Sequence, residues 1–293
     1  MRLTLKQVYK TYPGNVRSLN DINLDMDTKR VGILGNYGSG KTTLMNILAT
    51  VTKPTKGLVQ YNGSDFRESV DEFRSALGYL PQEFGVYGTL TAYEYLQYIS
   101  ALKGFDESSA EELITSALEK VRFPGANKVM MGSLSYGMRQ RVGIAQLFLT
   151  DPKVILVDEL SEDLSPQERK ENLELLEEHT HNKLFIYASD VANDFQHLVD
   201  EILILSKGKV VLQTTPEEFL QGVENKVWEL SMSNMTLSSV RKRFFITASE
   251  HTKDGIHIRC ISETQPTPAA VSVPATLHDA YQHFLSEIIR IIQ

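Results

Sequence analysis

Four short apolar runs stand out along the first two thirds of the chain, at residues 31–34, 154–157, 184–187 and 202–205. Each run is flanked by turn residues, and segments with apolar positions at helical spacing lie between them. Strands that are buried on both faces and alternate with helices are typical of a mostly parallel α/β sheet. The pattern therefore predicts an α/β core built on these four strands.

Between the first and the second predicted strand, the apolar residues recur with a different period. From about residue 91 to 146 apolar residues recur at intervals of three and four, as in Ile114, Ala117, Leu118 and Val121. This is the spacing of α-helices with one buried face. We therefore expect a helical subdomain, at about residues 84–146, inserted into the sheet domain.

The last 70 residues predict a smaller α+β region. Residues 226–231, 243–247 and 255–259 are typical of short, partly exposed, antiparallel strands, and residues 264–276 are typical of a linker. Thr276 with Asp279 three positions later indicates a capped helix start. The apolar stripe of that helix, residues 277–292, either packs on the small sheet or docks on a partner. The predicted domains are residues 1–223 and 224–293.

Composition narrows the class of protein. The 293 residues include 30 Lys+Arg and 37 Asp+Glu, a net charge of −7, which disfavours a broad nucleic-acid surface. The single cysteine, Cys260, excludes an internal disulfide and suits a small core residue in a reducing compartment. No apolar run approaches the roughly 18 residues that span a bilayer, and the start lacks the apolar stretch of a secretion signal. We expect no nucleic-acid partner and no membrane span.

A glycine-rich loop follows the first predicted strand and matches the pattern G-x-x-x-x-G-K-[ST]. In such a loop, backbone N–H groups and the next helix N-terminus surround the β- and γ-phosphates of a nucleotide. Lys41 brings a positive charge to those phosphates, and the Thr42 hydroxyl can bind Mg²⁺. The expected nucleotide-binding residues of this loop are Gly35, Asn36, Tyr37, Gly38, Ser39, Gly40, Lys41, Thr42 and Thr43.

Two carboxylates, Asp158 and Glu159, end the second predicted strand. Successive residues that leave a strand point in different directions, so the two can serve different atoms of one substrate. We expect Asp158 to bind Mg²⁺ and Glu159 to take a proton from the attacking water. General-base help of this kind is worth about 10²–10⁴ in rate.

The order of six motifs resembles that of the ATP-binding cassette (ABC) ATPases over about residues 1–220. Beside the P-loop and the Asp-Glu pair stand Tyr79-Leu-Pro-Gln82 and Leu134-Ser-Tyr-Gly-Met, which are similar to the family's glutamine loop and LSGGQ signature. A D-loop and a switch loop follow. The resemblance implies a P-loop NTPase cassette with a mostly parallel core sheet, an antiparallel edge sheet, an inserted helical subdomain and a small C-terminal α+β extension.

The resemblance also assigns residues. In this family two cassettes meet head to tail around ATP, which implies that Ser135 and the Gly137 backbone touch the γ-phosphate of ATP on the other subunit. Tyr12 stands where an aromatic residue stacks on adenine. Gln82 stands where a glutamine reaches Mg²⁺ and the water and senses a membrane partner. The exposed aromatics that follow Gln82, such as Tyr87, either contact that partner or belong to the core.

Three positions depart from the family pattern. Tyr136 replaces the first signature glycine, Ser165 replaces the D-loop aspartate in Leu160-Ser-Glu-Asp-Leu-Ser165, and Asp190 stands where the switch histidine belongs. An ionised aspartate at ~4 Å from a phosphate charge costs up to ~4 kcal/mol at an effective dielectric constant of about 20. Asp190 is therefore protonated, or turns away from the phosphate, or slows hydrolysis at this site. The hypothesis is a slow or conditional ATPase, with Glu159, Gln82 and Asp190 as the catalytic residues. The Glu-rich run 168–178 predicts a solvated helix face.

The resemblance implies an ATP- and Mg²⁺-dependent ATPase subunit that drives transport, in the direction of export, through separate transmembrane permease subunits. It would pair with a second nucleotide-binding subunit, in a homo- or heterodimer, and lie in the cytoplasm on the inner face of the cell membrane. The alternative is a catalytically weak cassette that regulates an active one. An ABC ATPase acting on ribosomes or DNA is disfavoured, because such chains carry two cassettes or a long coiled-coil insertion. A small GTPase is excluded because no N-K-x-D motif follows the P-loop.

Overall fold

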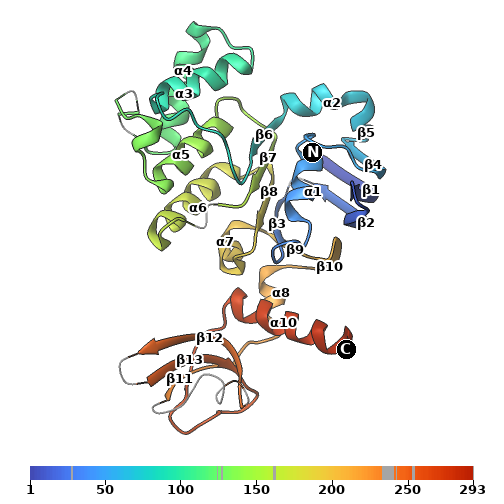
Figure 1. The fold of residues 1–293 in the computed structure, drawn as a ribbon, viewed down its shortest axis with the longest axis vertical. Helices are drawn as coiled ribbons and strands as arrows, with labels where there is room; N and C mark the ends of the chain where they lie inside the picture. Colours follow the sequence, from blue (N-terminus) through green and yellow to red (C-terminus); the bar gives the residue numbers. More distant parts are fainter. Residues whose placement is uncertain are drawn as a thin grey trace. The chain divides into compact units, whose positions relative to one another are not determined.

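The computed structural model describes residues 1–27, 29–123, 125–126, 128–160, 163–232, 241, 243–252 and 255–292, with side chains up to residue 288 (Figure 1). The chain forms two compact units. Unit 1 comprises Met1–Asp190 and His197–Gln213, and unit 2 comprises Val191–Gln196 and Thr214–Gln293. The domain boundary proposed after residue 223 stays a prediction. Within the described residues, every helix is too short or too polar to cross a bilayer.

A six-stranded sheet in the order β10-β9-β3-β8-β7-β6 forms the centre of unit 1. Its strands are β3 (Arg30–Leu34), β6 (Leu77–Leu80), β7 (Val154–Asp158), β8 (Leu184–Ser189), β9 (Glu201–Ser206) and β10 (Lys209–Thr214). The pairs β3–β8, β3–β9, β6–β7 and β7–β8 are parallel, and every residue of β7 and β8 is buried. The predicted mostly parallel core is confirmed, and continuous apolar runs mark strands that are covered on both faces.

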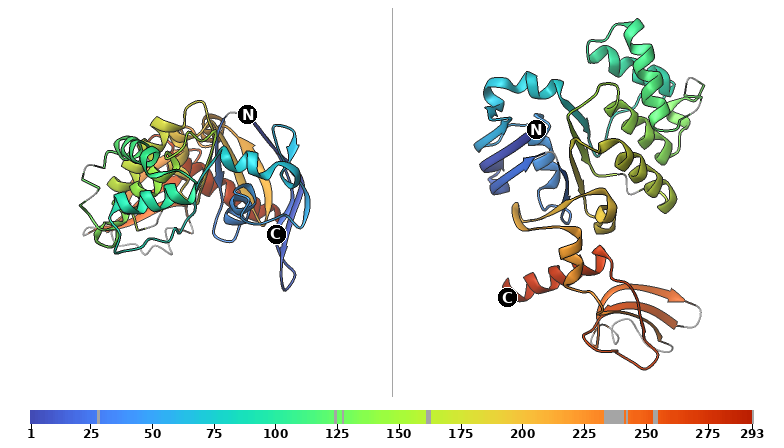
Figure 2. Two further views of the ribbon diagram at one scale, coloured as in Figure 1. Left: turned by 90° about the horizontal axis from the view of Figure 1, so that it is seen from above. Right: turned by 180° about the vertical axis from the view of Figure 1, so that it is seen from behind.

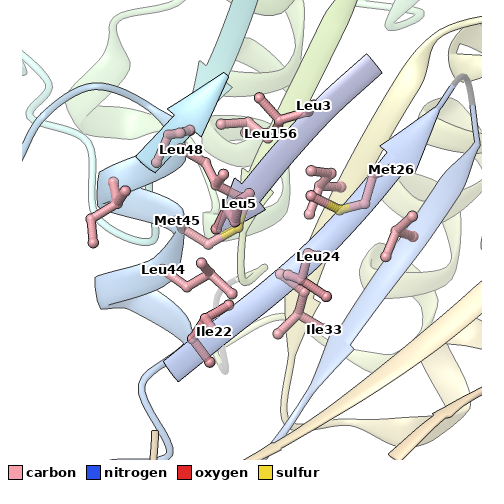
Figure 3. Packing of buried hydrophobic residues seen from close by; sticks show 14 of the residues in the cluster. Leu3, Leu5, Ile22, Leu24, Met26, Ile33, Leu44, Met45, Leu48 and Leu156 are labelled. Carbon is pink, nitrogen blue, oxygen red and sulfur yellow. The ribbon is translucent and has the colours of Figure 1, made fainter. Parts of the chain in front are cut away.

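An antiparallel sheet in the order β2-β1-β4-β5 packs against the core of unit 1. Its strands are β1 (Arg2–Tyr12), β2 (Val16–Asp27), β4 (Lys56–Tyr61) and β5 (Ser64–Asp65). Helix α1 (Lys41–Leu48) contributes Leu44, Met45 and Leu48 to one buried cluster with Leu3 of β1 and Leu156 of β7 (Figure 3). Because α1 contacts both sheets, the loop that precedes it is held on a rigid base.

One helix follows the antiparallel sheet, and further helices form the predicted inserted subdomain. They are α2 (Phe66–Ser75), α3 (Ala92–Leu102), α4 (Glu107–Lys120), the 3₁₀ turn η1 (Met131–Ser133) and α5 (Tyr136–Leu147), with α6 (Pro166–Thr180) after β7. Figure 2 shows α3 to α5, in green, on the opposite side of the central sheet from the blue antiparallel sheet. A capping box, Thr91 with Glu94, begins α3.

Unit 2 is built on a four-stranded sheet in the order β12-β13-β11-β14. Its elements are η2 (Ala192–Asp194), α8 (Pro216–Gln221), β11 (Val227–Met232), β12 (Phe245–Thr252), β13 (Gly255–Ile261), β14 (Val271–Ser272) and α10 (Leu277–Ile292), and the short α7 (Phe195–Leu198) continues from η2. β11 pairs with β13 and β14, and β12 with β13, all antiparallel. The expected linker was thus wrong in part, because Val271 and Ser272 pair with β11.

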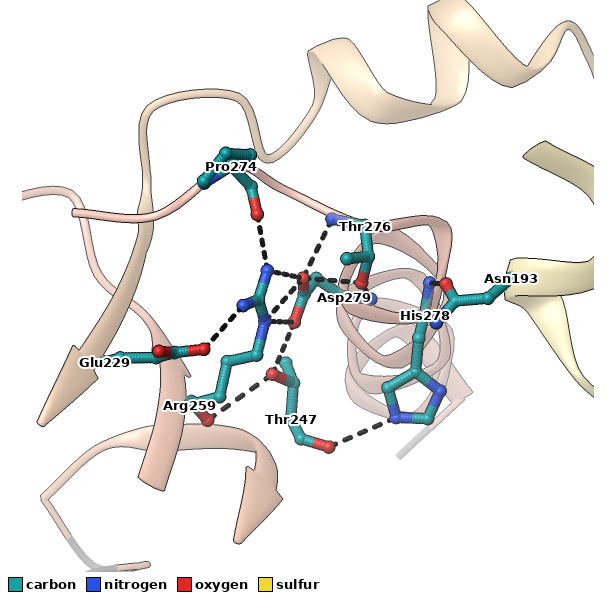
Figure 4. Close-up of polar contacts among 8 residues, drawn as sticks. All are labelled: Asn193, Glu229, Thr247, Arg259, Pro274, Thr276, His278 and Asp279. Atoms are coloured by element: carbon teal, nitrogen blue, oxygen red, sulfur yellow. Dashed lines mark hydrogen bonds and ion pairs between the residues drawn. The ribbon is translucent and has the colours of Figure 1, made fainter. Parts of the chain in front are cut away.

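The predicted helix cap in unit 2 is part of a larger polar network (Figure 4). Asp279 is fully buried and accepts hydrogen bonds from the Thr276 backbone N–H at 2.9 Å and from the Thr276 hydroxyl at 2.7 Å. The Arg259 guanidinium of β13 lies 2.8 Å from the same carboxylate and also bonds Glu229. The network ties α10 to the sheet, and His278 extends it to Asn193 of η2, whose side-chain oxygen accepts the His278 N–H at 2.9 Å.

The apolar stripe of α10 packs inside unit 2. Leu277, Ala280 and Tyr281 are buried, and Phe284 meets Phe219 of α8 with ring centroids 6.0 Å apart. The helix contacts β12, α8 and η2. The stripe therefore covers the small sheet and its neighbours, as far as its side chains are described.

Candidate nucleotide site

The P-loop joins β3 to α1 in a tight turn that requires glycine at both ends. A Cβ atom on Gly35 would lie 2.5 Å from the Leu205 carbonyl oxygen, and one on Gly40 would lie 2.8 Å from the Ser18 carbonyl oxygen. Gly40 is also the residue that precedes α1, with φ of 110°, a value that favours glycine. The helix N-terminus consequently faces the loop interior without a side-chain cap.

Polar groups inside this loop suit an anionic ligand. The Ser39 hydroxyl is buried and has no hydrogen-bond partner among the described residues. The Lys41 side chain is 6% exposed, and its Nζ donates to the Gly35 carbonyl oxygen at 2.7 Å. Asn36, Tyr37 and Gly38 are exposed at the tip of the loop. A buried cation and unpaired donors are what a triphosphate would neutralise and satisfy.

Asp158 ends β7 in a fully buried position. Neither of its carboxylate oxygens has a hydrogen-bond partner among the described residues. Burial raises its pKa to about 6, and the nearby Lys41 ammonium and Thr42 hydroxyl oppose the shift. Two buried acceptors without donors fit a cation ligand better than a structural acid. A single buried carboxylate beside the P-loop suits Mg²⁺, which usually takes one or two carboxylates together with substrate phosphates.

Glu159 leaves the strand with a left-handed backbone conformation, φ of 65°. Its N–H donates to the Ala188 carbonyl oxygen of β8 at 2.9 Å, and its carboxylate lies 4.0 Å from the Lys41 ammonium. Burial, opposed by the Lys41 ammonium and reinforced by the adjacent Asp190 carboxyl, raises its pKa to about 7. A carboxyl group that titrates near neutral pH has the property of a general base at physiological pH.

Asp190 directly follows β8 and is partly exposed. Its carboxyl group is close enough to that of Glu159 to raise the pKa of Glu159. The position expected to contact the γ-phosphate therefore acts on the general-base candidate, and the sequence could not show that these two side chains are neighbours.

Tyr12 lies beside the helix that follows the P-loop. Its hydroxyl is 3.5 Å from the Thr43 hydroxyl, which also accepts a 2.7 Å hydrogen bond from Ser18. The Lys10 ammonium lies 5.1 Å from the centre of the Tyr12 ring. With 37% of its surface exposed, the ring stays available at the edge of the loop. The structure therefore brings Tyr12 next to the predicted site.

The signature residues form a second polar group at the start of α5. Ser135 is the N-cap of this helix, and its hydroxyl oxygen accepts the Met138 N–H at 3.2 Å. The same hydroxyl donates to Glu168 of α6 at 2.9 Å. Gly137 is buried against Glu168, since a Cβ atom there would lie 2.4 Å from the Glu168 carboxylate. Glu168, in the glutamate run predicted as a solvated helix face, is partly exposed and makes these contacts in addition. The pattern Ser165-x-x-Glu168 is that of a capping box.

The remaining predicted residues lie elsewhere in unit 1. Gln82 is exposed two residues after β6, and none of its side-chain contacts with the described residues supports or opposes a role at the metal. Tyr87 is also exposed and pairs edge-to-face with Tyr98 at 5.6 Å. Ser161 and Glu162 of the predicted D-loop lie outside the described residues.

Comparison with known proteins places this geometry in a family. The family model described as "ABC transporter" matches residues 19–162. The uncharacterized ABC transporter ATP-binding protein YxlF of Bacillus subtilis is 30% identical over 247 residues, which cover 84% of this chain and 82% of that protein. The bacitracin transport ATP-binding protein BcrA of Bacillus licheniformis is 29% identical over 249 residues, 83% of this chain and 80% of that protein.

Solved structures support the same fold. The ATP-binding cassette MJ0796, in a dimeric post-hydrolysis state bound to ADP and Pi, superposes with a TM-score of 0.66 at 24% identity over 73% of this chain and 98% of that chain. Together with the P-loop, the Asp158-Glu159 pair and the signature, these relatives settle the family. The chain belongs to the ABC transporter ATP-binding proteins and has the P-loop NTPase cassette fold.

Proposed function

We propose that this chain is the ATP-hydrolysing subunit of an ABC transporter and powers export through separate permease subunits at the inner face of the cell membrane. The convergence of Lys41, Asp158 and Glu159 at one end of the parallel sheet carries this proposal. Export is the direction that the resemblance of the sequence implies, whereas the name of the bacitracin relative states transport without a direction. ATP would close a dimer of two nucleotide-binding subunits, and hydrolysis would reopen it.

Different residues of unit 1 would bind different parts of Mg-ATP. The P-loop glycines, Ser39 and Lys41 would bind the β- and γ-phosphates, and Tyr12 would stack on the adenine. Asp158, Thr42 and Gln82 would hold Mg²⁺, which neutralises charge on the phosphates when bound. Ser135 and Gly137 would contribute donors to the ATP held by the other subunit.

Glu159 would act as the general base and take a proton from the attacking water. The neighbouring Asp190 carboxyl sets a condition on that role, because it raises the pKa of Glu159 and so favours the protonated form, which cannot accept a proton. This supports a slow or conditional ATPase. The base is available only when Glu159 is ionised.

The alternative is a catalytically weak cassette that binds ATP and regulates an active one. It is favoured by Asp190 at the switch position and by Ser165 in the D-loop. Intact Glu159, with a pKa near neutrality, argues against it.

Mg-ATP turnover by the purified chain, with Glu159→Gln as the control, decides between the two. Turnover that the substitution abolishes supports an active motor. ATP binding with no turnover above that of Glu159→Gln supports the weak cassette. Absence of ATP binding contradicts both.

A further inference from the structure

One carboxylate, that of Glu168, connects the N-termini of two helices in unit 1. Its Oε1 accepts the Ser135 hydroxyl at 2.9 Å, at the start of α5. Its Oε2 accepts the Ser165 hydroxyl at 2.9 Å and the Ser165 N–H at 3.1 Å, at the start of α6. Glu168 therefore does more than cap its own helix.

The contact with α5 has the features of anion binding. The Glu168 carboxylate also lies so close to the Gly137 backbone that a Cβ atom at this position would be 2.4 Å from its Oε1. The first turn of α5 carries no acidic residue of its own. A negative group from α6 consequently supplies the charge that a helix N-terminus favours.

Two other helices of the described chain that have a glutamate in a capping box show that this arrangement is not a requirement of capping. Glu94 bonds only the backbone and hydroxyl of Thr91, and Glu218 bonds only Thr215 and its neighbour Thr214. Only Glu168, among these three capping glutamates, also binds a second helix. Its contact with Ser135 is therefore additional to its local role.

We propose that Glu168 is an internal competitor for the γ-phosphate of ATP bound to a second copy of this chain. Ser135 and Gly137 are the donors that the proposed function assigns to that phosphate, so the inference rests on the proposed function in its homodimeric form. A carboxylate and a phosphate cannot occupy the same donors, and their like charges repel. In the single subunit the Glu168 carboxylate accepts the hydrogen bond of the Ser135 hydroxyl. This carboxylate must leave Ser135 before the dimer can close around ATP.

The displaced Glu168 carboxylate would remain bound at the start of α6. After it leaves Ser135, the carboxylate keeps its two bonds to Ser165, so α6 stays capped. Binding of the partner's ATP at the signature would therefore move a carboxylate that is bonded to Ser165, and so would act directly on the start of α6. The contact raises the ATP concentration needed for dimerisation and couples closure to the start of α6.

The test measures ATP-dependent dimerisation of the full chain. Glu159→Gln serves as the background, so that bound ATP is not hydrolysed, and sedimentation velocity gives the dimer fraction against Mg-ATP concentration. Glu168→Gln, which keeps the size and the acceptor but removes the charge, is added to this background. The matched control is Glu94→Gln, which weakens an equivalent capping box far from the signature. Thermal unfolding of all three variants checks that each is folded.

We expect Glu168→Gln to lower the Mg-ATP concentration at half-dimerisation by roughly tenfold, while Glu94→Gln leaves it unchanged. Affinity of the monomer for ATP should be the same in all three. An unchanged or higher midpoint for Glu168→Gln overturns the inference, because Glu168 would then hold the signature in its productive form or have no role. Failure of the Glu159→Gln chain itself to dimerise contradicts the homodimeric function instead. If Glu168→Gln does not fold, Ser165→Ala replaces it. This variant weakens the binding of the Glu168 carboxylate at the start of α6, so that Glu168 binds Ser135 more firmly and the Mg-ATP concentration at half-dimerisation should rise. A lower concentration at half-dimerisation would overturn the inference.

Discussion

Glu159 and Asp190 directly follow the neighbouring parallel strands β7 and β8, and the Asp190 carboxyl is close enough to raise the pKa of Glu159. The Glu159 carboxylate also lies 4.0 Å from the Lys41 ammonium. The residue at the switch position therefore influences the protonation of the candidate base.

The first prediction concerns the pH dependence of hydrolysis. Burial and then Asp190 raise the pKa of Glu159 to about 7, so the basic form is lost below that pH. Single-turnover hydrolysis should fall about tenfold for each pH unit below the pKa and reach a plateau above it. Rapid-quench measurements from pH 5.5 to 8.5 give the profile. Asp190→Asn removes one acid of the pair and should move the midpoint to lower pH, and a flat profile for the unmodified chain would contradict the assignment of Glu159.

The second prediction restores the histidine at the switch position. Asp190→His removes the carboxyl group that raises the pKa of Glu159 and supplies a donor for the γ-phosphate. Single-turnover hydrolysis should rise about tenfold at pH 7. Asp190→Asn, which removes the charge without supplying a ring, is the matched control and should rise less. An unchanged rate for Asp190→His means that Asp190 does not limit the reaction.

The third prediction concerns the stability cost of the metal ligand. Burial raises the pKa of Asp158 from 3.8 to about 6, so the folded chain binds a proton that the unfolded chain releases between these values. The free energy of unfolding consequently falls as pH rises from about 4 to 6, with a total of about 3 kcal/mol at neutral pH. Asp158→Asn should therefore raise the melting temperature of the nucleotide-free chain at pH 7.5 and have little effect at pH 4. A lower melting temperature at pH 7.5 would show that the ionised carboxylate stabilises the empty site.

The features of this molecule that could be predicted from its sequence are those determined by residues close together along the chain. The P-loop is readable because Gly35, Gly40 and Lys41 lie within seven residues of one another and each meets a local requirement. Buried strands such as β7 are readable because every residue is apolar until Asp158. The Thr276 cap is readable because its partner is three residues away.

The parts that the sequence missed depend on side chains that meet across long separations. Ser135 and Glu168 are 33 residues apart, and no periodic pattern relates them. The left-handed backbone of Glu159, which helps to aim its carboxylate, is unusual for a residue with a side chain and has no sequence signal. The partner of Asp279 was hidden for the same reason, because Arg259 reaches it from another element.

The last prediction concerns the polar network of unit 2. Burial alone would raise the pKa of Asp279, but Arg259, Thr247 and Thr276 lower it below the usual value. Its stabilising effect is therefore present above the pKa of an unfolded aspartate and is lost as pH falls through the lower folded pKa. Asp279→Ala leaves Arg259 without its buried partner and should lower the free energy of unfolding of unit 2 by about 3–5 kcal/mol at pH 7.

The single tryptophan of the chain makes this measurable, because Trp228 lies in β11 of unit 2 and its indole N–H bonds the Ser262 carbonyl oxygen at 3.0 Å. Urea unfolding followed by Trp228 fluorescence reports unit 2 directly. Glu263→Gln removes an exposed ion pair with Lys226 in the same unit and should cost less than about 1 kcal/mol. If Asp279→Ala costs no more than this control, the buried charge pair contributes little, because its desolvation cost then equals its attraction.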